Sequence, residues 1–152
     1  MVSESPTHGF AIARELQAES DLGRILTVHR PLVYRALDRL TEAGLITSGA
    51  TEPGDAGPNR TVRKITRKGK TRLAKWFVEP VDHIRDLRIE FLIKLRLTER
   101  IGHDAGPLVR AQRDELAPTF TTLAAVGDAD DVVVQWRRHN AAAAQAFLDD
   151  LS

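Results

Sequence analysis

The first half of the chain predicts two helices from the spacing of its apolar residues. Two segments, His8–Glu19 and Arg30–Ala43, place apolar side chains three or four positions apart, which is the period of one helix face. Pro31 suits the first turn of the second helix, because its missing N–H has no partner to lose there. Gly44 suits the residue after the end of that helix.

A hairpin and a third helix are predicted next. Leu45–Ser48 and Arg60–Ile65 are strand candidates, and Gly49–Asn59 between them is rich in Gly, Pro and Asp, which predicts a loop. Thr66 is a good N-cap for a helix over Arg67–Val78. This order of elements is typical of a winged helix-turn-helix module, with the strands and loop as the wing. A generic surface hairpin has the same chemistry, so only the order of elements favours the wing.

The second half predicts three amphipathic helices and no strand. They span His83–Leu97, Gly106–Val126 and Asp131–Leu151, and Pro118 predicts a kink in the middle one. Three helices alone make a thin bundle, so a second copy of the chain is a natural partner for their apolar faces. Packing on the N-terminal half is the alternative. The residues predicted at a dimer interface are Phe91, Leu95, Val133, Trp136, Phe147 and Leu151.

The predicted fold class is mainly α with a small two-stranded β wing. A winged helix-turn-helix domain is expected over residues 1–79 and a C-terminal helical dimerisation domain over residues 80–152. The chain of 152 residues contains no cysteine, which excludes a disulfide framework, a thiolate zinc site and a cysteine nucleophile. No run of about 18 apolar residues could span a bilayer, so we expect a soluble, cytoplasmic protein with no membrane partner.

Charge is unevenly distributed along the chain. The net charge is only +1, but residues 1–79 carry 13 Lys and Arg against 9 Asp and Glu, whereas residues 80–152 carry 9 against 12. Between Ala56 and Val78 there are eight basic residues and no acidic one. Such a block next to structured segments is typical of a surface that binds phosphate groups. A solvated basic surface without a ligand is the competing interpretation.

The sequence gives little support for catalysis or metal binding. Histidine occurs at positions 8, 29, 83, 103 and 139, with no His-x-x-x-His pair and no phosphate-binding or nucleophile motif. His8 is more plausible as a helix-start residue than as a general base. Asp128, Asp130 and Asp131 could hold a hard cation, but they lack the later Glu of a calcium loop and are better explained as the start of the last helix. We therefore predict no catalysis, no metal and no cofactor.

Three separated motifs resemble those of the PadR-like transcriptional regulators. Ser5–Phe10 resembles the family's P-x-H-G-[YF] segment. Val33–Leu40, followed by Gly44–Ile46, resembles its recognition-helix signature L-Y-x-A-L-x-x-L-x-x-x-G-L-I. Ile65–Gly69 is similar to the L-T-x-x-G that closes the family's wing. The resemblance covers about residues 5–79, and the later helices resemble the long helical C-terminal domain of one subgroup in pattern only.

The resemblance implies a dimeric winged-helix regulator, most often a repressor, that binds double-stranded DNA with inverted half-sites. It also implies a small aromatic effector, for which Trp76, Phe91 and Trp136 are candidate contacts, although all three are equally suited to a core. A winged-helix protein–protein adaptor without DNA binding is the alternative function. An adaptor has no need of eight clustered basic residues.

The predicted DNA contacts lie on the second helix and on the wing. Arginine at the recognition helix can donate two hydrogen bonds to guanine, and wing cations are expected to contact phosphates. One difference from the family concerns the start: only Met1–Glu4 precedes Ser5, where the family has a helix. We therefore expect the native protein to begin upstream of Met1, which the genomic DNA would test. The predicted contact residues are His29, Arg30, Tyr34, Arg35, Arg39, Arg60, Arg63, Lys64 and Lys68.

Overall fold

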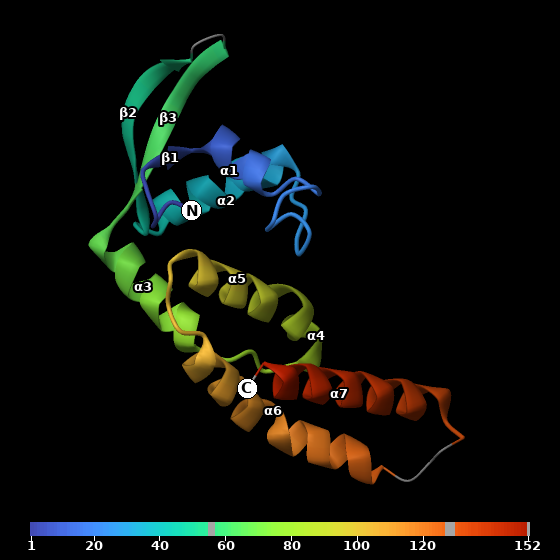
Figure 1. The fold of residues 1–152 in the computed structure, drawn as a ribbon. Helices are drawn as coiled ribbons and strands as arrows, with labels where there is room; N and C mark the ends of the chain where they lie inside the picture. The colour runs from blue at the N-terminus through green and yellow to red at the C-terminus, as the bar shows by residue number, and fades with distance from the viewer. Residues whose placement is uncertain (55–56, 127–129, 152) are drawn as a thin grey trace. The chain divides into compact units, whose positions relative to one another are not determined.

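The computed structural model describes residues 1–54, 57–126 and 130–151, with the side chains of residues 50 and 52–59 outside the description. The chain divides into two compact units, Met1–Trp76 and Phe77–Ser152. Each unit has its own hydrophobic core. As the sequence predicts, the protein is mainly helical, with a small antiparallel wing followed by C-terminal helices (Figure 1). No described helix is long and apolar enough to cross a membrane.

The N-terminal unit has the order of elements expected for a winged helix. Its first helix is shorter than predicted and ends at Glu15, and the hydroxyl of Ser20 donates to the carbonyl oxygens of Glu15 and Gln17, at 2.6 and 2.7 Å. These bonds satisfy carbonyl groups at the end of the helix and favour a turn there. The elements are β1 (Thr7–His8), α1 (Gly9–Glu15), α2 (Arg30–Glu42), β2 (Ile46–Gly54), β3 (Gly57–Ile65) and α3 (Arg67–Val78).

The sheet of this unit has three strands rather than the two predicted. Its order is β1-β3-β2 and all pairs are antiparallel, with both Thr7 of β1 and Ser48 of β2 opposite Arg63 of β3. The hairpin is also longer than predicted, because β2 and β3 pair across most of Gly49–Asn59. Two register irregularities interrupt the pairing, at Ser48/Thr51 and Glu52/Gly54. Bulges of this kind accommodate turn-forming residues within a hairpin.

The core of the N-terminal unit lies between α1, α2 and the base of the hairpin. Its buried members are few, and an apolar groove of about 510 Å³ beside them is lined by residues that include Leu40, Leu73 and Trp76. Gly44, at φ 68°, follows α2 in a left-handed conformation that glycine adopts without strain. The buried residues are Ile12, Ala13, Val33, Leu37 and Ile46.

The C-terminal unit contains the three predicted helical segments. A π-helical turn, η1 (Leu87–Phe91), divides the first segment, and α6 continues through Pro118. Within this unit α6 and α7 run side by side in opposite directions (Figure 1). The other elements are α4 (Ile84–Asp86), α5 (Leu92–Arg100), α6 (Gly106–Ala125) and α7 (Val132–Asp150). The core consists of Val81, Leu87, Phe91, Leu108, Val109, Leu116, Phe120, Ala141 and Leu148.

Buried polar side chains hold the segment before α4 onto this core. Gln112 is fully buried and bonds both backbone groups of Val81, accepting from its N–H and donating to its carbonyl, each at 2.8 Å. The ammonium group of buried Lys94 donates to the carbonyl of Glu79 at 2.6 Å and pairs with Glu90 at 3.0 Å. A buried polar group is tolerated when its hydrogen bonds are satisfied, so these two residues fix the start of the C-terminal unit.

Candidate nucleic-acid interface

Helix α2 separates its apolar and its cationic side chains. Val33 and Leu37 are buried in the core of the N-terminal unit, whereas Arg35 and Arg39 are exposed. Neither of these arginines forms an ion pair with a described residue. His29 lies at the N-cap without a side-chain capping bond. Helix α2 is therefore held by its buried residues to the core of the N-terminal unit, and its arginine side chains extend into solvent.

The ring of Phe10 connects the start of α2 with the wing. The guanidinium of Arg30, the first residue of α2, lies 4.9 Å from the ring centroid, and that of Arg60 on β3 lies 5.8 Å from it. Both distances are within the range of cation–π attraction. Phe10 follows the P-x-H-G segment, and it brings two of the predicted DNA contacts close to each other.

A hollow of about 440 Å³ lies beside the N-terminus of α2. Its lining combines Arg14 and Gln17 from α1 and the segment after it with His29 and Arg30 from the start of α2. The N-terminal end of a helix carries partial positive charge, so Arg14 and Arg30 add to a positive surface. Sequence reasoning missed Arg14, because an arginine inside an amphipathic helix gives no signal that separates it from an ordinary solvated residue.

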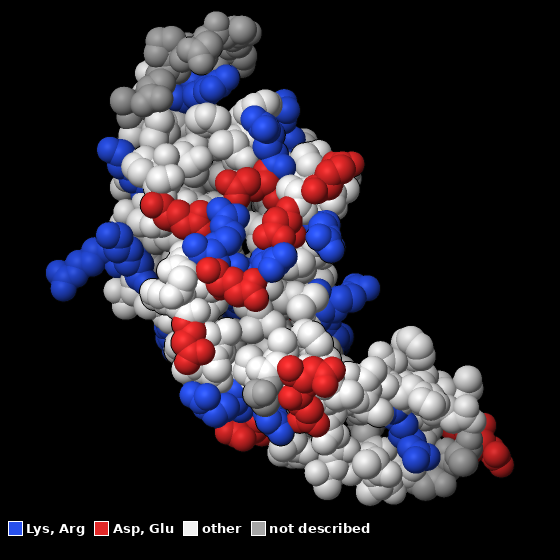
Figure 2. Space-filling model, viewed as in Figure 1, with Lys and Arg blue, Asp and Glu red and all other residues white. Residues whose placement is uncertain are grey.

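The wing strand β3 directs its cations to opposite faces. Lys64 is exposed, whereas the neighbouring Arg63 has a side chain only 14% exposed. Arg63 donates to the hydroxyls of Thr41 at 3.0 Å and Ser48 at 2.7 Å and to the carboxylate of Asp38 at 3.3 Å. The guanidinium of Arg63 is therefore bound by side chains of its own unit, and the phosphate contact expected for Arg63 stays a prediction. On the face drawn in Figure 2, Lys and Arg side chains border the tip of the wing.

Lys68 is also bound to its own unit. Its ammonium group donates to the carbonyl of Ala43, the C-cap residue of α2, at 2.8 Å. A cation at a helix C-terminus is favoured by the helix dipole. Lys68 remains exposed, so it stabilises the end of α2 while its side chain is still in contact with solvent.

Comparison with known proteins places this unit in a family. The model of the transcriptional regulator PadR-like family matches residues 1–75. The chain belongs to this family. Among solved structures, Bacillus subtilis PadR in complex with operator DNA is 17% identical and covers 99% of this chain and 92% of its own, with a TM-score of 0.49. The Streptococcus mutans protein smu.1604c is 16% identical and covers 97% and 91%, with a TM-score of 0.44. No curated protein matches the sequence.

The PadR-like motifs have identifiable structural roles in this chain. His8 is the N-cap of α1, as expected for a helix-start residue, and its Nδ1 accepts from the N–H of Ala11 at 3.1 Å. A Cβ on Gly9 would lie 2.7 Å from the ring of Tyr34, so the glycine lets α1 approach α2. Tyr34 packs over Gly9 while 42% of it stays exposed. The first and second motifs therefore form one contact.

The third PadR-like motif joins the wing to α3. The hydroxyl of Thr66 accepts from the N–H of Gly69 at 3.0 Å, which confirms it as the N-cap of α3. The same hydroxyl donates to the carbonyl of Gly44 at 2.7 Å. A Cβ on Gly69 would collide with the carbonyl oxygen of Leu45. The Thr and the Gly of this motif are thus required by the close approach of α3 to the segment after α2.

The predicted dimer-interface residues occupy two different environments. Phe91, which was predicted at the dimer interface, is fully buried in the core of its own unit, and Leu95 packs partly buried against that core. The other four are exposed on α7 or just after it: Val133, Trp136, Phe147 and Leu151. In Figure 2 the visible face of the C-terminal helices includes a broad uncharged area.

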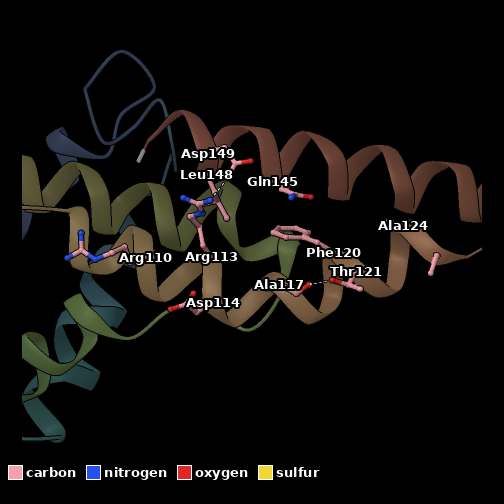
Figure 3. Close-up of a pocket in the computed structure, with 11 residues that line it drawn as sticks. Arg110, Arg113, Asp114, Ala117, Phe120, Thr121, Ala124, Gln145, Leu148 and Asp149 are labelled. Carbon is pink, nitrogen blue, oxygen red and sulfur yellow. Dashed lines mark hydrogen bonds and ion pairs between the residues drawn. The ribbon is translucent and has the colours of Figure 1, made fainter.

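The aromatic residues suggested for an effector also occupy separate environments. Trp76 lines the apolar groove of the N-terminal unit, Phe91 belongs to the core of the C-terminal unit, and Trp136 is 69% exposed on α7. A further hollow of about 810 Å³ lies between α6 and α7. Figure 3 shows Arg113 of α6 and Asp149 of α7 meeting at its edge, where an ion pair joins them at 2.8 Å.

The aspartates before α7 start that helix. Asp131 is its N-cap, and its carboxylate accepts from the N–H of Val133 at 2.7 Å. Asp128, which was considered with it as a cation ligand, lies outside the described residues. Among the described residues, no group of three or more His, Cys, Asp or Glu side chains is arranged to hold a metal ion.

Proposed function

We propose that this member of the PadR-like family is a dimeric, sequence-specific DNA-binding repressor. The observation that carries the proposal is the outward face of α2, where Arg35 and Arg39 are exposed. A helix of this kind fits the major groove, and each arginine that pairs with a guanine contributes about 1–3 kcal/mol of discrimination. Tyr34, exposed at the same surface, is proposed to donate its hydroxyl to a phosphate.

The proposed backbone contacts come from the start of α2 and from the wing. Arg30 at the start of α2 and Arg60 of β3, both held on the ring of Phe10, and exposed Lys64 of β3 supply the cations. His29 and the newly identified Arg14 extend this surface along the hollow at the start of the helix. Such contacts determine where the protein sits on the duplex without reading sequence.

A homodimer is proposed from the exposed apolar stripe on α7. Val133, Trp136 and Phe147 are exposed apolar residues at helical spacing, and Leu151 follows them. A stripe of exposed apolar side chains on one helix is typical of an interaction site. A symmetric dimer would present two copies of α2, which matches the proposed inverted half-sites.

A small aromatic effector is part of the proposal. Support comes from the apolar groove of the N-terminal unit, whose volume of about 510 Å³ and almost wholly apolar lining suit a small aromatic molecule. Quenching of tryptophan fluorescence would report its binding near Trp76. If an effector released the protein from DNA without quenching either tryptophan, the effector site would not be the apolar groove beside Trp76.

The proposal is tested by binding to the DNA upstream of the protein's own gene. Fluorescence anisotropy is measured for that duplex and for an unrelated duplex, at 50 and 200 mM salt. A dimer that contacts roughly six to eight phosphates should lose about 10³- to 10⁴-fold in affinity between these two salt concentrations. Preferential binding with this salt dependence supports the proposal. Preference without salt dependence would refute the role of the wing cations, and no binding to either duplex at low salt would favour the adaptor.

A further inference from the structure

Arg63 occupies a position between the wing and helix α2. It lies on β3, the central strand of the sheet, directly opposite Ser48 of β2 and Thr7 of β1. Its guanidinium leaves the sheet toward α2, where it reaches the hydroxyl of Thr41 at 3.0 Å and the carboxylate of Asp38 at 3.3 Å. One side chain therefore joins both strands of the wing to the last two turns of α2.

The hydrogen bonds around Arg63 form a connected network. Thr41 accepts from the guanidinium and donates its own proton to the carbonyl of Leu37 at 2.8 Å. Ser48 accepts from the same guanidinium nitrogen at 2.7 Å. Since the guanidinium is planar and its donors are rigidly spaced, its three bonds fix the direction of the group as well as its position.

Burial distinguishes this contact from an ordinary surface ion pair. The side chain of Arg63 is 14% exposed, whereas that of Asp38 is 63% exposed. The pair with Asp38 alone is expected to contribute little, because solvent screens an exposed carboxylate. The bond to Thr41 is partly buried and requires Arg63 to remain directed toward α2, whereas the bond to Ser48 of β2 is exposed. Its neighbours Val62 and Lys64 alternate to the other side of the strand.

We propose that Arg63 is a positioning residue that holds the wing at a fixed angle to α2, so that both elements meet the same stretch of DNA. The inference rests on the proposed function, because the surface being aligned is the proposed DNA interface. Arg63 itself does not contact DNA. Its loss allows the wing to adopt other angles, and only the fraction of molecules with the correct angle binds specifically.

The test compares Arg63→Gln with Lys64→Gln, which removes the same charge from the neighbouring residue on the opposite side of the strand. Affinities are measured for the operator and for an unrelated duplex across a series of salt concentrations. Lys64→Gln should reduce the slope of log affinity against log salt by about 0.9 per subunit. Arg63→Gln should leave that slope unchanged, weaken operator binding by about tenfold, and leave non-specific binding unaffected.

Two further variants separate alignment from charge. Arg63→Lys keeps the positive charge but cannot reach three acceptors, so it should behave as Arg63→Gln does. Asp38→Asn removes a negative charge close to the DNA surface, which by charge alone would strengthen binding to any duplex. If Asp38 helps to align the wing, this variant instead lowers the ratio of operator affinity to non-specific affinity.

The outcomes are distinguishable from failure of the proposed function. If the wild-type protein binds neither duplex, the proposed function is wrong. If the wild type binds but Arg63→Gln leaves the affinity ratio unchanged, the positioning role is wrong. A salt slope reduced as in Lys64→Gln and restored by Arg63→Lys would make Arg63 a direct phosphate contact. Should Arg63→Gln fail to fold, Asp38→Asn and Thr41→Val decide the question, since the first removes only the charge of one partner and the second only one acceptor.

Discussion

Helices α2 and α7 differ in what they expose. In α2, Val33 and Leu37 face the core and the outward face carries arginine. In α7, Ala141 and Leu148 face the core, yet Trp136 is 69% exposed and further apolar side chains lie along the same stripe. A cationic face suits a partner with negative charge, whereas an apolar face suits a partner that removes it from water. The two helices therefore indicate two different partners, DNA for α2 and a second copy of the chain for α7.

The largest effect is expected from placing charge on the apolar stripe of α7. The double replacement Trp136→Asp and Phe147→Asp should convert the proposed dimer into monomers, because each buried aromatic contributes about 1.5–3 kcal/mol and a buried unpaired carboxylate costs more. Operator affinity should fall by about 10³-fold or more, since half of the contacts are lost. Light scattering gives the mass, and anisotropy gives the affinity.

Ala146→Asp is the matched control for that experiment, because Ala146 is exposed on α7 outside the stripe. It adds the same charge to the same helix and should leave a dimer. A soluble dimer that persists in the double variant would show that α7 is not the interface. The assignment of a second copy of the chain as the partner of α7 would then be wrong.

An intermediate effect is expected from the outward face of α2. Arg35→Ala should weaken operator binding by roughly 10- to 100-fold, the equivalent of about 1–3 kcal/mol, with no change in the mass of the dimer. Arg72→Ala removes the same charge from α3, at the apolar groove of the N-terminal unit, and should change specific binding by less than about threefold. Equal losses in the two variants would mean that α2 contributes only general positive charge.

The smallest effect is expected at the N-cap of α3. Thr66→Val removes the hydroxyl that accepts from Gly69 and donates to Gly44, which should lower the free energy of unfolding by about 1 kcal/mol. Hydrogen exchange should accelerate in the first turn of α3 and remain unchanged in α7, because the two helices belong mainly to different units. Faster exchange throughout α7 would contradict the separation of the two units.

Sequence reasoning worked best where one residue pattern had one physical explanation. The apolar spacing in Arg30–Ala43, together with Pro31 and Gly44, predicted α2 to within a residue of its ends. The N-cap role of Thr66 was predicted for the same reason, since its side chain acts on the adjacent backbone. The order of elements, confirmed by the winged-helix fold, required no knowledge of long-range contacts.

Features that depend on distant contacts could not be predicted. The strand β1 exists because Thr7 and His8 pair with β3, more than fifty positions later. The role of Arg63 depends on residues of α2 and β2, so in the sequence it is one of eight similar cations. Phe91 and Trp136 both belong to amphipathic patterns, yet only the packing of the unit determines that one is buried and the other exposed.

Hydrogen exchange with and without operator DNA tests the central claim most directly, because it follows α2 and α7 in one sample. The duplex is the one that binds preferentially in the anisotropy experiment, and the protein is kept at a concentration where its mass is that of a dimer. Binding of DNA should slow hydrogen exchange in α2 and in β3, and leave the exchange rates of α7 unchanged. Slower exchange confined to α7, or equal protection of both helices, would contradict the assignment of α2 and the wing as the DNA-binding surface.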